Sequence, residues 1–238
     1  MTKFIPQVFT ASLLFAAPLH AQTYLFDDGN WDPNNMTQNP DGSWVADSIP
    51  GGGTPAVVYN GLCWDPSGTN TMTFQTNFID NNDAGDDNGI WDIALIGSSG
   101  SKIFGRIDFW DASGGTLSYS VHSIDSGDTS NTTVTGSTNL SSLYDPLVVH
   151  DLEWNVTGNG LGDYTFGLTI TNTATGIDLV NSSNVGSVTN TSILGDSEIC
   201  PNWCAKHDAG SFNLPVPEPS SAVLALLALG AFTMGRRR

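Results

Sequence analysis

The chain reads Leu147-Val-Val-His-Asp-Leu-Glu-Trp-Asn-Val156, turns through Thr157-Gly-Asn-Gly-Leu-Gly162, and continues Asp163-Tyr-Thr-Phe-Gly-Leu-Thr-Ile-Thr171. Apolar and polar residues alternate in both flanking runs, which is the period of strands with one buried face. The glycines between them allow the backbone conformations that a tight connection needs. We therefore predict an antiparallel hairpin over residues 147–171.

Four earlier runs repeat this kind of pattern at residues 71–79, 90–96, 103–110 and 117–124. The run 90–96 is almost continuously apolar, as in a strand buried on both faces, and Gly97-Ser-Ser-Gly-Ser101 is a plausible hairpin loop after it. Residues 27–53, rich in Asp, Asn, Gly and Pro, are expected to be irregular or to form two short strands. No segment between residues 22 and 215 has the period of a three-turn amphipathic helix. The expected fold is an all-β, antiparallel, jelly-roll-like sandwich forming one domain over residues 22–215.

The two ends of the chain differ from this middle. At the C-terminus, Val216-Pro-Glu-Pro-Ser-Ser221 precedes an apolar run over residues 222–234 and a terminal cluster of Arg236, Arg237 and Arg238. The prolines keep the motif extended. The apolar run is expected to form a single hydrophobic helix that enters the membrane transiently, with the arginines on the cytoplasmic side. At the N-terminus, Lys3, the mostly apolar residues 4–17 and Ala21 predict a signal peptide over residues 1–21.

The three-part tail over residues 216–238 resembles the PEP-CTERM sorting signal of Gram-negative bacteria. This resemblance implies that an exosortase-type membrane protease recognises Pro217, Glu218 and Pro219, cuts nearby, and releases or transfers the protein. Such proteins typically occur in bacteria that make extracellular polysaccharide. The implied location is the cell surface or the extracellular space, with exopolysaccharide as a possible partner.

The net charge of residues 22–215 limits the classes of partner that this domain can bind. Residues 22–215 hold three basic residues, Lys102, Arg106 and Lys206, against 23 acidic ones, a formal charge of −20. Nucleic acids and anionic membrane surfaces require positive charge and are therefore excluded as partners. Divalent cations and neutral sugars are compatible with this charge. The strands 148–154 and 164–170, together with the strand starting at Ile103, also resemble jelly-roll domains of the concanavalin-like or laminin-G kind, which often bind sugars.

The densest group of oxygen ligands is the loop Asp80-Asn-Asn-Asp-Ala-Gly-Asp-Asp-Asn-Gly89. Calcium prefers six to eight oxygen ligands, so this loop is a candidate Ca²⁺ site. The candidate ligands are Asp80, Asp83, Asp86, Asp87 and Asn88. The spacing does not follow the EF-hand pattern, and a solvated acidic turn is the competing interpretation.

The three cysteines are Cys63, Cys200 and Cys204. In an oxidising compartment we expect a structural disulfide. Either Cys200 pairs with Cys204 within a small loop, or Cys63 pairs with one of them across the sandwich. A zinc site that includes His207 is the less favoured alternative because the ligand spacing is irregular.

Seven tryptophans raise the question of sugar contacts, because sugars stack on exposed indole faces. Trp91 and Trp154 fall in apolar strand patterns and are expected in the core. Trp31, Trp64 and Trp203 fall in polar, Pro-containing segments and are the candidate sugar contacts.

The sequence offers little support for catalysis, although an aspartate-based site is compatible with its 21 aspartates. With Glu only at positions 153 and 198 of the domain, there is no closely spaced pair of glutamates on one strand, and neither a Gly-x-Ser-x-Gly elbow nor a His-Glu-x-x-His motif occurs. His122 and His150 lie on strand patterns and are expected to be structural. We expect a non-enzymatic protein with a structural or carbohydrate-binding role. The alternatives are a secreted hydrolase of extracellular polysaccharide that uses aspartates, and an adhesin that binds protein partners.

Overall fold

The computed structural model describes residues 20–25, 31–34, 36–41, 43–45, 56–61, 63–79, 90–108, 116–125, 131–139, 145, 147–206 and 211–212. The expected signal peptide, except its last two residues, the candidate calcium loop and the tail lie outside these residues. The described strands are β1 (His20–Leu25), β2 (Trp31–Asn34), β3 (Thr37–Gln38), β4 (Trp44–Val45), β5 (Ala56–Tyr59), β6 (Thr69–Ile79), β7 (Ile90–Gly97), β8 (Lys102–Asp108), β9 (Thr116–Ile124), β10 (Asn131–Asn139), β11 (His150–Asn159), β12 (Asp163–Asn172), β13 (Ile177–Thr189), β14 (Ile199–Lys206) and β15 (Ser211–Phe212).

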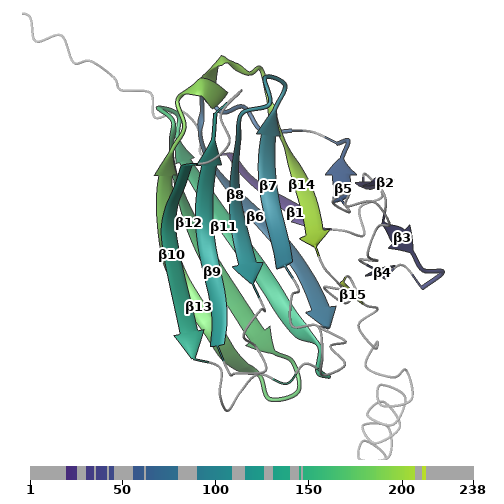
Figure 1. Ribbon diagram of the computed structural model, residues 1–238. Coiled ribbons are helices and arrows are strands. Elements are labelled where there is room, and N and C mark those ends of the chain that lie inside the picture. The colour runs from purple at the N-terminus through teal and green to yellow at the C-terminus, as the bar shows by residue number, and fades with distance from the viewer. Residues whose placement is uncertain are drawn as a thin grey trace, which may run out of the picture.

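These strands form two sheets that face each other. Sheet A has the order β13-β12-β11-β6-β15-β4-β3, with β1 also beside β6, and sheet B has the order β10-β9-β8-β7-β14-β5-β2. In Figure 1 the long strands of sheet B lie in front of those of sheet A, so the outer face of sheet B is turned toward the viewer. The all-β sandwich expected from the sequence is confirmed.

The core fills the space between the two sheets. Alternate residues of each long strand point inward, as the period of two requires. Sheet A contributes Met72 and Phe74 of β6 and Trp154 of β11, and sheet B contributes Trp91 of β7 and Ile103 of β8. All five side chains are at most 2% exposed. The core positions expected for Trp91 and Trp154 are therefore confirmed.

The predicted hairpin is present as β11 and β12, with Trp154 opposite Leu168. Its turn uses Gly160 and Gly162 at φ +74° and +95°, a left-handed conformation that favours glycine. The second predicted hairpin joins β7 to β8, with Ala94 opposite Phe104.

Two expectations about strands need correction. The sandwich is not purely antiparallel, because β1 pairs with β6 in parallel register, with Tyr24 opposite Phe74. The described part of residues 27–53 forms three short strands, β2, β3 and β4, where irregular structure or two short strands were expected. The strands β10 and β13 lie outside the segments predicted as strands, because neither has regular alternation of apolar residues, and each is a strand through pairing with a neighbour in its sheet.

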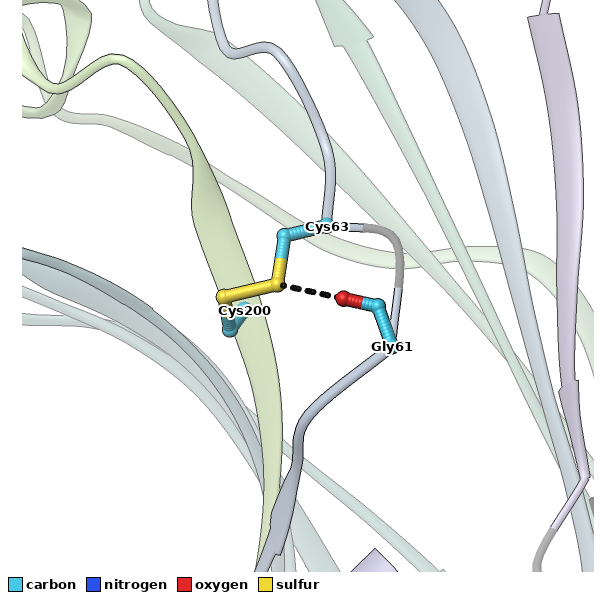
Figure 2. The surroundings of a disulfide bond; sticks show 3 residues. All are labelled: Gly61, Cys63 and Cys200. Atoms are coloured by element: carbon cyan, nitrogen blue, oxygen red, sulfur yellow. Dashed lines mark hydrogen bonds between the residues drawn. A yellow bond between two sulfur atoms is a disulfide. The ribbon is translucent and has the colours of Figure 1, made fainter. Parts of the chain in front are cut away.

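A disulfide joins Cys63 to Cys200, with the two sulfur atoms 2.01 Å apart. It fastens the segment before β6 to the start of β14, as Figure 2 shows. Backbone hydrogen bonds in both directions between Trp64 and Ile199 extend this connection. Of the alternatives left open by the sequence, a bond between Cys63 and one of the two later cysteines is the one present, and Cys204 lies outside it. The bond does not cross the sandwich as expected, because it joins neighbouring segments of sheet B.

Helical structure among the described residues is limited to the 3₁₀ turn η2 (Ser192–Gly195). The Asp196 carboxylate that follows accepts hydrogen bonds from the Ser99 amide at 2.8 Å and from the Ser98 hydroxyl at 2.9 Å, which ties this turn to the β7–β8 hairpin. Within the described part of the chain, no helix has the length and apolar character needed to span a membrane. The expected hydrophobic helix over residues 222–234 lies outside that part.

Candidate binding surface on the outer face of sheet B

Two of the three candidate sugar-contacting tryptophans are in the core, which corrects the sequence-based expectation. Trp203 is fully buried and packs against Trp91, with ring centroids 5.5 Å apart. Trp64 is 4% exposed and meets Tyr164 edge to face at 5.9 Å. Neither indole offers a face to a sugar. The third candidate, Trp31, lies in β2, and its side chain is outside the described residues.

For Trp203, the wrong prediction has its origin in Pro201. In the sequence, Cys200-Pro-Asn-Trp-Cys204 resembles a loop because proline lacks the amide that a central strand needs. In the structure the segment is β14, where Pro201 faces Leu95 of β7. The pairing with β5 on the other edge starts only at Asn202. The proline therefore sits where one edge of the strand is not paired with β5, and Trp203 lies on the inner face.

The metal predictions have two outcomes. The candidate calcium ligands Asp80, Asp83, Asp86, Asp87 and Asn88 lie outside the described residues, so the site stays a prediction, as does the alternative use of His207. Within the described residues, one group of potential ligands is brought together: Cys63, Glu198 and Cys200. Because its two sulfur atoms form the disulfide, this group lacks the thiolates that zinc binds.

Polar chemistry collects on the outer face of sheet B, defined here by the outward residues of β7, β8, β9 and β14. Directly paired strand positions share a face, so the register groups these residues in rows. One row consists of Cys204, Asp92, Arg106 and Ser120, and the next consists of Asn202, Ala94, Phe104 and His122. Lys102 follows along β8, opposite Ile96 and Ile124.

Arg106 is held in a fixed orientation by Asp92. Its Nε donates to Asp92 Oδ1 at 2.6 Å and its Nη2 donates to Oδ2 at 2.7 Å, a bidentate ion pair. The Asp92 side chain is 7% exposed and the Arg106 side chain is 24% exposed. The Asp92 carboxylate is therefore the buried partner, and about a quarter of the Arg106 side chain is exposed to solvent.

Phe104 lies at the centre of the same surface and supports three polar neighbours. The His122 ring stacks on it at 4.4 Å, the Arg106 guanidinium carbon lies 5.4 Å from its centroid, and Lys102 Nζ lies 5.9 Å from it. Phe104 itself is only 8% exposed, so it orders these groups without offering its own face to a ligand. His122 Nε2 lies 2.5 Å from the Ser120 hydroxyl in a hydrogen bond.

The outer face of sheet A differs in chemistry. It carries polar side chains connected in register across β6, β11, β12 and β13. At its centre, Glu153 accepts hydrogen bonds from Gln75 and Asn155, both at 2.6 Å. The residues that form this face are Thr69, Thr71, Thr73, Gln75, Asn77, Asp151, Glu153, Asn155, Thr157, Asn159, Asp163, Thr165, Thr169, Thr171, Asp178, Asn181, Ser187 and Thr189. No aromatic or basic residue is among them.

The residues on the outer face of sheet B were not singled out as a site from the sequence, and His122 was expected to be structural. The signal was nevertheless present in the strand period. Arg106 stands two residues from Phe104 in the predicted strand 103–110, which Lys102 directly precedes, and His122 stands two residues from Ser120 in the predicted strand 117–124. The sequence does not predict the register in which these two strands, β8 and β9, pair.

The chain shares a family motif at one end and a fold with solved structures. Residues 215–238 match the model of the PEP-CTERM protein-sorting motif, whereas no curated protein is significantly similar in sequence. The chain is similar to the carbohydrate recognition domain of Emp46p, with a TM-score of 0.50 and 12% identity over 78% of this chain and 85% of that one. This similarity supports the jelly-roll fold alone.

Two enzymes show weaker similarity. The Crh5 transglycosylase in complex with NAG has a TM-score of 0.42 and 11% identity over 82% of this chain and 68% of that one. The alginate lyase Aly36B in complex with alginate tetrasaccharide has a TM-score of 0.42 and 11% identity over 77% of this chain and 82% of that one. The tail motif is a substrate signal for exosortase processing. The chain is thus a jelly-roll protein that carries a PEP-CTERM sorting motif, exported to the cell surface or extracellular space of a Gram-negative bacterium.

Proposed function

We propose that this protein is a non-catalytic, polysaccharide-binding component of the outer cell surface or of the exopolysaccharide matrix. The binding site is the outer face of sheet B around Arg106, His122 and Lys102. The observation that carries the proposal is the bidentate pair between Arg106 and the buried Asp92, set beside His122 and Phe104. Export to the cell surface or extracellular space, which the tail motif indicates, supports the proposal.

The physical argument rests on preorganisation. A sugar ligand gains little from one hydroxyl contact, so the cost of ordering protein side chains decides whether binding is measurable. Here Asp92 holds the guanidinium at two points and Phe104 stacks with the imidazole, so both donors are ordered before a ligand arrives. The outer face of sheet A has no aromatic support, and its central polar groups already bond to one another.

Retention of the exported protein on its host's own exopolysaccharide tests the proposal. Wild-type protein from the culture medium is passed over the immobilised polymer with Ca²⁺ and again with a chelator. The His122→Gln variant keeps a polar side chain but removes the stacked ring, and should elute several-fold earlier. Thr157→Val, on the outer face of sheet A, is the matched control and should elute like wild type.

Three results would contradict this assignment. No retention of wild-type protein in either buffer would remove the binding function. Loss of retention in Thr157→Val but not in His122→Gln would move the site to sheet A. Release of shortened glycan or free acid from the polymer would favour the hydrolase alternative over a non-catalytic role.

A further inference from the structure

The basic residues of this acidic domain are unevenly distributed. Residues 22–215 contain only Lys102, Arg106 and Lys206 as basic residues against 23 acidic ones. Lys102 and Arg106 are both on the outward side of β8, and Lys206 ends β14. The outer face of sheet A carries instead Asp151, Glu153, Asp163 and Asp178. Two of the three basic residues of the domain therefore lie on the candidate surface of sheet B.

We infer that the polysaccharide bound on the outer face of sheet B carries carboxylate groups, as in a polymer with uronic acid residues; this inference rests on the proposed function. Lys102 and Arg106 are four strand positions apart, so their backbones are separated by about 13 Å. Both cationic groups lie against the ring of Phe104, which stands between them. A polymer that runs along β8 meets both of them.

Charge-assisted hydrogen bonds favour this ligand class over a neutral glycan. A carboxylate receives N–H donors from a guanidinium or an ammonium in shorter and stronger bonds than a sugar hydroxyl does. The geometry of Arg suits a planar carboxylate in particular. Asp92 offsets part of the Arg106 charge, whereas no ion pair involving Lys102 occurs among the described residues.

The net charge of −20 repels an anionic polymer. The distance over which this repulsion acts decides whether the polymer binds. At about 0.15 M salt the Debye length is about 8 Å, so direct contacts persist while distant carboxylates are screened. At about 0.01 M salt it is about 30 Å, and the whole acidic domain then repels the polymer. We therefore expect binding to be strongest at intermediate ionic strength and to weaken in both directions.

The decisive comparison uses the host's exopolysaccharide before and after chemical reduction of its carboxylates to primary alcohols. The inference predicts that the exported wild-type protein binds the native polymer at least tenfold more tightly than the reduced polymer. Lys102→Met keeps the aliphatic stem and removes the charge, and should weaken binding to the native polymer about tenfold. It should leave binding to the reduced polymer unchanged.

Controls separate a local contact from a general charge effect. Thr157→Glu makes the same change in net charge on the outer face of sheet A and should have less than a twofold effect on binding at 0.15 M salt. Arg106→Lys keeps the charge but loses the bidentate geometry, and should bind more weakly than wild type. If this variant fails to fold, Lys102→Met alone still tests the inference, because the Lys102 ammonium is outside the ion pair with Asp92.

The outcomes are distinguishable. Equal binding to native and reduced polymer overturns the inference and leaves the proposed function in place. Equal weakening by Lys102→Met and Thr157→Glu also overturns it, because the effect then follows net charge. No binding to either polymer overturns the proposed function together with the inference.

Discussion

Replacing Gly105 with alanine tests how the sandwich is packed. Gly105 lies on the inner side of β8, between the outward residues Phe104 and Arg106. A Cβ at this position would lie 2.8 Å from two ring carbons of Trp154, Cη2 and Cζ3. Ordinary carbon contacts are about 3.5–4.0 Å. One of the two groups must therefore move by roughly 0.7 Å.

Trp154 has little room to move. Its side chain is fully buried, and Phe166 meets it edge to face at 6.1 Å. Overpacking of this kind costs about 1–3 kcal/mol, and the reduced entropy of the unfolded Ala chain offsets about 0.4–1 kcal/mol. We expect Gly105→Ala to lower the free energy of unfolding by about 1.3 kcal/mol, the difference between these two effects. For a domain of this size that lowers Tm by about 3–5 °C.

Urea unfolding monitored by tryptophan fluorescence, together with a thermal scan, measures this effect. Gly195→Ala is the matched control, because its Cβ meets nothing within 4 Å and no positive φ is recorded there. It should be neutral or stabilising by up to about 1 kcal/mol. Trp154→Phe combined with Gly105→Ala should cost less than the sum of the two single changes, because the smaller ring relieves the overlap. A Gly105→Ala variant as stable as wild type would refute the packing argument.

Three further predictions concern the disulfide, the loss of stability at alkaline pH and the processing of the tail. The double change Cys63→Ser with Cys200→Ser removes a crosslink between residues 137 positions apart, and should lower the free energy of unfolding measured in urea by about 4 kcal/mol. Cys204→Ser should lower it by less than about 1 kcal/mol, and equal effects of the two changes would contradict the crosslink. Burial and the nearby Asp163 carboxylate raise the pKa of Tyr164 to about 12, so the stability from keeping this phenol neutral is complete below pH 10 and is lost between pH 10 and 12. Wild type should lose about 2 kcal/mol more than Tyr164→Phe across that window, and parallel curves would contradict this. The intact mass of protein recovered from the medium should correspond to a chain that ends before the apolar run 222–234, and a mature protein that retains Arg238 would contradict processing at the tail.

The sequence predicted the parts of the fold that are set by local pattern. Alternation of apolar residues located β6, β9, β11 and β12, because each has one inner and one outer face. The continuous run at 90–96 became β7, where Asp92 and Ala94 on the outer side are buried by neighbouring side chains as well. The PEP-CTERM tail was recognised because its three parts are contiguous in the chain.

Features that depend on distant pairing were not predicted. β1 runs parallel to β6 although some 50 residues separate them, and nothing in either segment specifies the partner. The apolar residues of β13 do not alternate regularly, and the segment is a strand because β12 pairs along it. The choice of Cys200 over Cys204 as the partner of Cys63 also depends on the pairing of β14, which brings residue 200 beside the segment before β6.

The wrong predictions for Trp64 and Trp203 follow from the way in which a β-sandwich fills its core. A sandwich of two sheets must fill a core about 10 Å thick, and large aromatic side chains fill it efficiently. Of the tryptophans whose side chains are described, Trp44, Trp64, Trp91, Trp154 and Trp203 are all buried for that purpose. Aromatic content in such a chain therefore indicates core volume more strongly than sugar binding. In a domain with 23 acidic residues and three basic ones, a basic residue is the rarer signal. Residues two places apart on a strand share a face. The position of Arg106 on β8 therefore identifies the outer face of sheet B as the surface whose chemistry differs from that of sheet A.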